Sequence, residues 1–453
     1  MSETDMSASP AAATPLPRKN RRMERRAALA ASGGTVLEYF DFAIFGLLAA
    51  TVFPTVFFQD MDGPAALLAS FATYGVAFAA RPIGSIVFST IGDRRGRRGV
   101  LIATLWMMGL ATALMGLLPG YATIGIAAPV ILVVLRFVQG IASGGEISGA
   151  QILALEHAPT ERRGRAGSSV AIASPLAQAL ATLVMAGLTA GLSAEDFVAW
   201  GWRIPLVASL VLLVFAAWVR SGVSETPEFV AAEERAEKRT AEPTGPVQVL
   251  RRYPGTIVLL VLSYAGPAGV FPMVTAFGVS YMNKAGGLAS STTFVLFLCA
   301  QLVALCAALA GGRVADRIGA RNTMLIGLTT LAVAFVPLFP VVHTGNVLLI
   351  GACTAVTIAS IIFVMAAQAS FYAYAFPVRM RYFGSSISYA TTNVLFGGTA
   401  AVVATWLLGV SAGNVWLVTA YGLVLVVASF LAVLARPAHP EPVEEMLVDQ
   451  DTR

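Results

Sequence analysis

The stretch "GDRRGRRG", residues 92–99, decides the fold, because a charged turn of the same kind returns in the second half of the chain. There, "ADRIGAR" contains Asp316, which lies 223 positions after Asp93. A second pair of motifs, "PTERRGRAGSS" from Pro159 and "PVRMRYFGSS" from Pro377, recurs at an offset of 218 positions. Two motifs that repeat at nearly one offset indicate a duplicated unit.

The residues between these turns belong in a membrane. Hydrophobic residues make up 57% of the 453-residue chain, charged residues only 12%, and the mean hydropathy is +0.75. A soluble chain needs more polar surface than this, and the apolar runs are long enough to cross a hydrocarbon layer of roughly 30 Å as helices. We predict an all-α membrane protein with twelve transmembrane helices in two pseudo-symmetric six-helix bundles. The predicted spans are 28–57, 65–90, 100–118, 123–155, 166–191, 203–220, 255–282, 291–312, 323–341, 346–375, 384–410 and 415–435.

Charge sets the predicted orientation. Nearly all Lys and Arg residues lie in the N-terminal arm, the linker and the connections on one face, whereas the other face has almost none. By the positive-inside rule, that basic face and both termini are cytoplasmic, in a multi-pass protein of the cytoplasmic membrane. The net charge of +5 therefore needs no nucleic-acid partner. The predicted domains are a cytoplasmic arm (1–26), a first bundle (27–220), a cytoplasmic linker (221–252), a second bundle (253–435) and a cytoplasmic tail (436–453).

Four motifs resemble one family of transporters. They are "EYFDFAIFG" (38–46), "ARPIGSIVFSTIGDRRGRR" (80–98), "LRFVQGIASGGEISGA" (135–150) and "FPVRMRYFGSS" (376–386). Together they are similar to the metabolite:proton symporter family of the major facilitator superfamily. The resemblance implies a major facilitator fold, alternating access between the halves, and no cofactor beyond the proton gradient as energy source. It implies substrates such as organic acids, or zwitterions such as proline and betaine. We expect a monomer in the lipid bilayer that binds a small-molecule substrate and H⁺.

Glu38 and Asp41 stand out because the run from Ala27 to Phe58 otherwise has no charged residue. Residues three apart share a helix face, and a charge in mid-membrane costs at least about 2.5 kcal/mol. Two neighbouring carboxylates in a low dielectric disfavour double ionisation, so one can exchange a proton near neutral pH. Both are proton-coupling candidates, and Asp41, the deeper one, is preferred; a static ion pair is the alternative. Glu146 is a third candidate, as a relay or gate acid or as the partner of a loop arginine.

Arg81 and Arg136 are the basic residues deep inside predicted spans. A guanidinium binds a carboxylate bidentately and stays charged, so each can hold a substrate carboxylate or neutralise the buried acids. Arg136 is preferred as the partner of the substrate carboxylate, and for Arg81 both roles stay open. Gln139 belongs to the same Arg-x-x-Gln-Gly motif as Arg136. The second half has essentially no interior charge and supplies neutral candidates for substrate binding, which serve equally well in helix packing. These are Tyr264, Gln301, Gln368, Tyr372, Tyr389 and Asn393.

The charged turns are candidate gates. In the family that the motifs resemble, this loop packs against the other half at the cytoplasmic face and stabilises the outward-open state. Simple surface charge is the alternative. The residues concerned are Asp93, Arg94, Gly96, Arg97 and Arg98 in the first half and Asp316 and Arg317 in the second.

The leading functional hypothesis is proton-coupled symport of a small organic anion. A zwitterionic osmolyte symporter and a drug or metabolite exporter are the alternatives. An ATP-driven pump is excluded, because its phosphate-binding loop needs a lysine after a glycine and none of the three lysines follows one. No span holds a nucleophile–base pair or a metal-ligand cluster, so we predict neither an enzyme nor a metal site.

Overall fold

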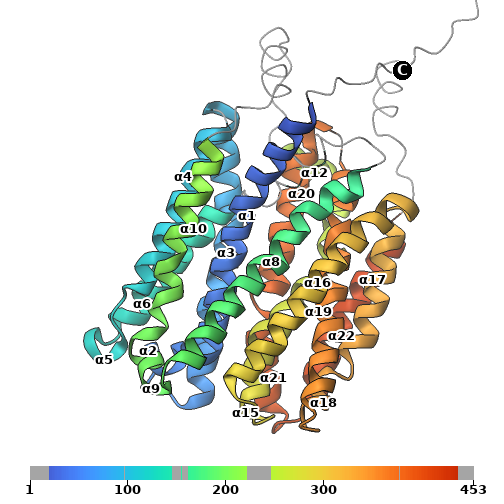
Figure 1. The fold of residues 1–453 in the computed structure, drawn as a ribbon. Coiled ribbons are helices and arrows are strands. Elements are labelled where there is room, and N and C mark those ends of the chain that lie inside the picture. The colour runs from blue at the N-terminus through green and yellow to red at the C-terminus, as the bar shows by residue number, and fades with distance from the viewer. Residues whose placement is uncertain are drawn as a thin grey trace, which may run out of the picture.

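The structure is a computed structural model that describes residues 20–95, 97–144, 151, 155, 162–221, 246–376 and 378–436. All regular secondary structure within these ranges is helical (Figure 1). The first half comprises α1 (Asn20–Thr51), α2 (Phe53–Phe57), α3 (Gly63–Arg95), α4 (Arg97–Gly116), α5 (Tyr121–Ile124), α6 (Ala127–Ser143), α8 (Arg163–Gly191), α9 (Ala194–Asp196), η2 (Phe197–Gly201) and α10 (Arg203–Ser221).

The second half begins after α12 (Pro246–Arg252), which lies in the predicted linker. It comprises α13 (Pro254–Ser263), α14 (Ala265–Pro272), η3 (Met273–Phe277), α15 (Gly278–Lys284), α16 (Ser290–Ile318), α17 (Ala320–Phe335), α18 (Leu338–Val342), α19 (Val347–Ala373), α20 (Val378–Thr392), η4 (Asn393–Gly397), α21 (Ala400–Val410) and α22 (Trp416–Ala435).

These helices follow the order of the predicted spans. Among the described residues, nine helices are long and apolar enough to cross a membrane, and the pair Ala194–Gly201 and Arg203–Trp218, bent by 48°, adds a tenth. Two shorter apolar helices, Ile102–Gly116 and Ala127–Ser143, stand where the third and fourth spans are predicted. The predicted fold class, an all-α membrane protein, is confirmed.

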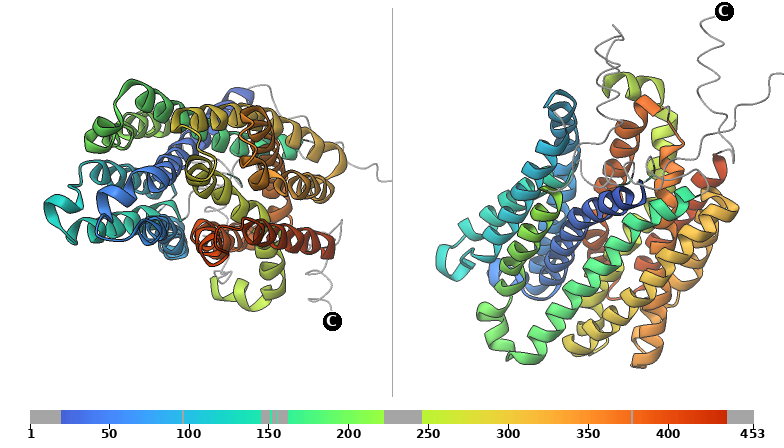
Figure 2. Two further views of the ribbon diagram at one scale, coloured as in Figure 1. Left: turned by 90° about the horizontal axis from the view of Figure 1, so that it is seen from below. Right: turned by 45° about the horizontal axis from the view of Figure 1, so that its top comes forward.

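The two halves form bundles that lie side by side. Figure 2 shows the first half, blue to green, next to the second half, yellow to red, with α8 packed along α16. Glycines allow the halves to come close: a Cβ on Gly75 of α3 would lie 2.6 Å from the carbonyl oxygen of Gly398. A Cβ on Gly164 of α8 would lie 2.6 Å from the carbonyl oxygen of Gly312 on α16. Such small residues are what close helix packing in a membrane requires.

Two spans of the second half are interrupted near their middle. The seventh span leaves helical geometry at Tyr264 and contains the π-helical turn η3 directly after Pro272. The eleventh contains η4, which begins at Asn393. Proline removes a backbone donor, and π-helical turns occur often at functional sites. Both interruptions border the central cavity described next.

Candidate functional site

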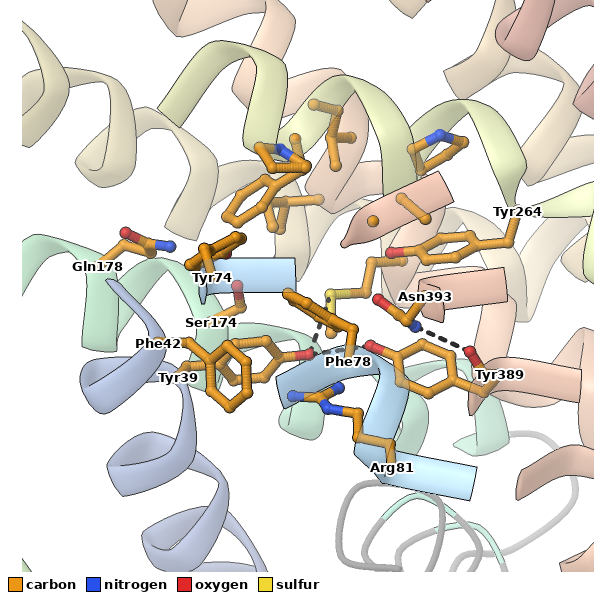
Figure 3. A pocket seen from close by; sticks show the side chains of 18 residues that line it. Tyr39, Phe42, Tyr74, Phe78, Arg81, Ser174, Gln178, Tyr264, Tyr389 and Asn393 are labelled. Carbon is orange, nitrogen blue, oxygen red and sulfur yellow. Dashed lines mark hydrogen bonds between the residues drawn. The ribbon is translucent and has the colours of Figure 1, made fainter. Parts of the chain in front are cut away.

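A cavity lies between the two halves and is lined by 18 side chains (Figure 3). The first half supplies residues of α1, α3 and α8, and the second half supplies residues of α14, α19, α20 and η4. Seven of the lining residues are aromatic, and Arg81 is the one charged residue among them. The site therefore has mostly apolar walls with a few fixed polar groups, as small-molecule sites generally have. Its lining residues are Tyr39, Phe42, Tyr74, Phe78, Arg81, Ser174, Gln178, Tyr264, Pro267, Ala268, Phe271, Pro272, Ile361, Ile362, Met365, Tyr389, Asn393 and Gly397.

Arg81 is held on the cavity wall by Glu38. Its Nη2 lies 2.8 Å from Glu38 Oε1, and both side chains are buried. The guanidinium also lies over the rings of Phe42 and Phe78, 4.5 and 4.7 Å from their centroids. Phe42 is one helical turn after Glu38 and Phe78 is one turn before Arg81, so α1 and α3 each present an aromatic ring beside their charged group. The arginine is thus fixed in position on the cavity wall.

Hydroxyl and amide groups from both halves meet in the same cavity. The Tyr39 and Tyr389 hydroxyls lie 3.4 Å apart, and the Asn393 side-chain amide donates to the Tyr389 carbonyl at 2.9 Å. The rings of Tyr264 and Tyr389 lie 6.1 Å apart. Tyr39 comes from the first half and the other three from the second, so a ligand here would touch both bundles. Tyr39 escaped the sequence analysis because nothing but its place between the two acids distinguishes it from other membrane tyrosines.

Asp41 belongs to a separate polar cluster inside the first bundle. Thr112 of α4 donates to Asp41 Oδ2 at 2.6 Å and accepts from the Gln139 amide at 2.7 Å. Arg136 Nη1 in turn donates to Gln139 Oε1. All four side chains are buried. Asp41 and Arg136 are therefore connected through two neutral side chains, and we call this set the Asp41–Arg136 chain.

Aromatic rings lie between Arg136, at one end of the Asp41–Arg136 chain, and the cavity. Arg136 lies over Phe42, Phe45 and Tyr74, with centroid distances of 4.3, 3.9 and 5.5 Å. Phe42 and Tyr74 line the cavity, whereas Arg136 and Asp41 do not. A cation enclosed by ring faces is stabilised by their quadrupoles.

The two acids therefore have different partners although they share a helix face. Within the described part of the chain, the ion pairs are Glu38–Arg81 and Asp316–Arg165. Asp41 has no arginine in contact there, and Arg136 Nε and Nη2 make no hydrogen bond in the same described ranges. From the sequence, Arg136 is preferred as the arginine that pairs with a substrate carboxylate. In the structure Arg81 contacts Glu38 and lines the cavity, whereas Arg136 does not line it.

The remaining substrate-binding candidates divide between the cavity and contacts between helices, one of which joins the two halves. Tyr264 and Asn393 line the cavity. Tyr372 donates to the Leu260 carbonyl at 2.6 Å, Gln368 accepts from Gln151 at 3.2 Å, and Gln301 is buried on α16. None of these three, nor Gln139, lines the cavity, and Glu146 lies outside the described residues.

Asp316 connects the halves at the end of the molecule where α8 begins. Its Oδ1 accepts from the Gly164 backbone N–H at 2.7 Å and its Oδ2 lies 2.9 Å from Arg165 Nε. Since α8 starts at Arg163, the carboxylate satisfies an unpaired donor at a helix N-terminus, where the dipole also favours negative charge. Arg163 Nη1 adds a second link between the halves, donating to the Tyr374 hydroxyl at 2.7 Å.

The other gating candidates have no described role in this contact. Arg317 is exposed. Gly96 lies outside the described residues. Four more fall within α3 and α4, but their side chains are outside what the structure describes: Asp93, Arg94, Arg97 and Arg98.

Two helical bundles around a buried central cavity define a membrane transport protein. The sequence profile of the Major Facilitator Superfamily matches residues 31–400, and the chain belongs to that superfamily. Among curated relatives, it is 36% identical to the inner membrane metabolite transport protein YhjE of Escherichia coli, over 87% of this chain and 90% of the relative. It is 33% identical to the shikimate transporter of the same organism, over 86% and 89%. It is 31% identical to a putative proline/betaine transporter of Staphylococcus aureus, over 85% and 82%.

Solved structures show the same fold. The partially occluded, inward-open xylose transporter XylE of E. coli superimposes with a TM-score of 0.71 at 17% identity, covering 92% of this chain and 98% of that one. A crystal structure of a D-xylose–proton symporter matches with a TM-score of 0.68 at 18% identity, covering 89% and 97%. The protein is thus a transporter rather than an enzyme, and the predicted membership of the superfamily is confirmed.

Proposed function

We propose that the protein is a proton-coupled symporter of a small organic monoanion, working by alternating access as a monomer. The observation that carries the proposal is the Arg81–Glu38 pair of 2.8 Å on the wall of the cavity. A guanidinium has five N–H donors in a fixed fork. It can keep its bond to Glu38 and still receive a substrate carboxylate from the cavity side. Because the cavity lies within one chain, a monomer suffices.

The buried charges support coupling of one proton to one negative charge. The described residues buried in the middle of the first bundle include two acids, Glu38 and Asp41, and two arginines, Arg81 and Arg136. Their formal charges cancel. A bound monoanion would leave one uncompensated negative charge, which is costly in a low dielectric. One proton taken up with the monoanion restores neutrality, and this is the physical basis proposed for symport.

Asp41 is the proposed proton site. Glu38 has an arginine in contact and is favoured as the anion, whereas Asp41 has hydrogen bonds from neutral groups instead. Burial without a contacting cation favours the neutral carboxyl group. Protonation of Asp41 would also remove the negative charge nearest to Arg136. The electrostatic potential of the first bundle, which holds the substrate anion, would then become more positive.

The walls of the cavity favour a substrate with one carboxylate and an apolar or hydroxylated body. Only one basic side chain lines the cavity among the described residues, so a di- or tricarboxylate would bring charges without partners. The hydroxyls of Tyr39 and Tyr389 and the amide of Asn393 can bind hydroxyl groups on the substrate. The name of one relative, the shikimate transporter, is consistent with such a monoacid.

A zwitterionic osmolyte is the second candidate, favoured by the aromatic walls. Rings such as those of Tyr74, Tyr264 and Phe271 can bind a quaternary ammonium group by cation–π contact. Another relative carries the name putative proline/betaine transporter. A zwitterion brings no net charge, however, so its uptake with a proton would leave the buried groups with one positive charge in excess.

Both candidates are tested in proteoliposomes of the purified full-length protein. Radiolabelled shikimate, 2-oxoglutarate and glycine betaine serve as probes, with and without an imposed proton gradient. Accumulation of the monocarboxylate that requires the gradient and is abolished by a protonophore supports the proposal. Accumulation of the zwitterion alone would favour the second candidate, and uptake indifferent to the gradient would defeat proton coupling. The same assay on vesicles of defined orientation gives the direction of transport. Protease access to the termini in those vesicles tests their proposed cytoplasmic location.

A further inference from the structure

We propose that Thr112 is a positioning residue for the proton site: its hydroxyl sets the proton affinity of Asp41 and passes the protonation state of that acid to Arg136 through Gln139. The inference rests on the proposed role of Asp41 as the proton carrier. Thr112 carries no charge and lies in the apolar sequence "LATALMG", residues 110–116, so nothing in the sequence singles it out.

The hydroxyl of Thr112 has two acceptors for one proton. Its Oγ1 lies 2.6 Å from Asp41 Oδ2 and 3.1 Å from the Met108 carbonyl oxygen. It can donate to only one of them at a time. When Asp41 is ionised, the charge-assisted bond to the carboxylate is the stronger one. When Asp41 carries the proton, its O–H can donate to Oγ1 and the threonine hydrogen can turn to Met108.

The next link in the chain has a fixed direction. Arg136 can only donate hydrogen bonds, so Gln139 must present its oxygen to Arg136 and its NH₂ group to Thr112. Thr112 Oγ1 has two acceptor lone pairs, and it can accept from Gln139 in both protonation states of Asp41. Protonation of Asp41 therefore alters the charge next to Thr112 and Gln139 without breaking the hydrogen bonds of the Asp41–Arg136 chain. The dipoles of these two neutral side chains transmit the change to Arg136.

Few other groups lie close enough to set the proton affinity of Asp41. The titratable side chains that face the cluster are Glu38 on α1, Tyr74 and Arg81 on α3, and Arg136 on α6. From α4 and α10, the other helices packed against it, the neighbouring polar groups are the hydroxyls of Thr112 and Ser209. Glu38 and Arg81 are engaged with one another. Among the neutral neighbours of Asp41, which also include Gln139 and Ser209, Thr112 donates the 2.6 Å hydrogen bond to Oδ2, and removal of its hydroxyl leaves every charge in place.

The test follows protonation of Asp41 without any transported ligand. Infrared difference spectra of the full-length protein in liposomes, recorded during a pH titration, contain the carbonyl-stretch band of a protonated carboxyl group. Asp41→Asn must remove the titrating band and so assigns it. Removing a hydrogen bond to the ionised form favours the proton, so Thr112→Val is expected to move the midpoint to higher pH by about one to two units. Thr112→Ser, which keeps the hydroxyl, is expected to titrate like the wild type.

A matched control makes the same change elsewhere. Thr354 is also buried, and its hydroxyl donates to the Ile350 carbonyl of its own helix. Thr354→Val is expected to leave the midpoint unchanged. Should Thr112→Val not be recovered folded, Thr112→Ala makes the same test without a branched side chain.

The outcomes separate this inference from the proposed function. A wild-type midpoint in Thr112→Val, with a band that still disappears in Asp41→Asn, overturns the role of Thr112 and leaves Asp41 as the proton site. A band that survives Asp41→Asn overturns the assignment of the proton to Asp41 and the present inference with it. A shift that occurs equally in Thr112→Ser also overturns the inference, because the hydroxyl would then not be its cause.

Discussion

Glu38 and Asp41 lie three residues apart on α1, yet one contacts Arg81 on the cavity wall and the other contacts Thr112 inside the first bundle. The first acid holds a residue of the cavity lining, whereas the second does not line the cavity. The rings of Phe42 and Tyr74, which do line it, lie against Arg136 at the other end of the Asp41–Arg136 chain. This division gives each acid a different proposed role, and each role has consequences that can be measured.

Arg81→Gln removes one member of the buried ion pair and leaves the Glu38 carboxylate without its arginine. We expect a loss of stability of about 3–5 kcal/mol and no measurable substrate binding. The double variant Glu38→Gln/Arg81→Gln should recover most of the stability, because neither charge remains, but should not recover binding. Thermal unfolding and a binding titration measure the two effects. A double variant that binds the wild-type substrate normally would show that Arg81 has no role in recognition.

The cavity tyrosines are expected to affect affinity and not coupling. Tyr39→Phe and Tyr389→Phe each remove one hydroxyl group that faces the cavity. One lost neutral hydrogen bond of about 1 kcal/mol raises the KM roughly fivefold. The pH dependence of uptake should stay as in the wild type, since neither hydroxyl belongs to the Asp41–Arg136 chain. An altered pH profile in Tyr39→Phe would place this tyrosine in the proton path instead.

Asp316 is expected to hold the halves together at the N-terminus of α8. Asp316→Ala removes the acceptor of the Gly164 N–H and the partner of Arg165. Hydrogen bonds to charged groups contribute about 1.5–3 kcal/mol, enough to change the population of the opened state by tenfold or more. A cysteine at Ser168, which packs against Gly312, reports this opening through its reaction with a maleimide after the three natural cysteines have been replaced.

The labelling experiment has a close control in the next residue. Arg317 is exposed, so Arg317→Ala should leave the reaction rate of the cysteine at position 168 unchanged. Equal rates in Asp316→Ala and the parent protein would mean that the carboxylate does not stabilise this contact.

Gly75 tests how closely the halves must approach in the middle of the membrane. A Cβ at this position would lie 2.6 Å from the Gly398 carbonyl oxygen, which belongs to the other half. Gly75→Ala should therefore slow transport severalfold, because the neighbouring atom is backbone and one bundle must shift away from the other to admit the added carbon. Gly63→Ala, at a site with no atom within 4 Å of the added carbon, is the matched control. Unchanged transport in Gly75→Ala would show that the close approach is not required in the cycle.

The architecture was predictable because it depends on the bilayer. Every backbone group in the hydrocarbon layer needs a partner, so long apolar runs must be helices, and the repeated turns around Asp93 and Asp316 reveal the duplication. The breaks at Tyr264 and Asn393 were not predicted, since a single proline or glycine in a membrane helix does not specify where the regular helix is interrupted.

The partners of the site residues were less predictable than their depth. Spacing along a helix states which residues share a face, but not which neighbouring helix that face meets. Arg136 has the burial expected for a functional arginine, yet aromatic side chains from α1 and α3 enclose it and separate it from the cavity. Nothing in the sequence distinguishes Thr112 from other buried threonines, which usually donate a hydrogen bond to their own helix backbone, as Thr354 does.

The most direct test of the account compares two transport modes in Asp41→Asn. The amide keeps the shape of the carboxyl group but cannot take up and release a proton. We expect exchange of internal for external substrate without a gradient to persist, while accumulation driven by an inside-alkaline gradient is lost. Asp196→Asn, an exposed acid at the start of η2, is the control and should accumulate substrate normally. Gradient-driven accumulation at the wild-type level in Asp41→Asn would contradict the central claim that this buried acid carries the coupled proton.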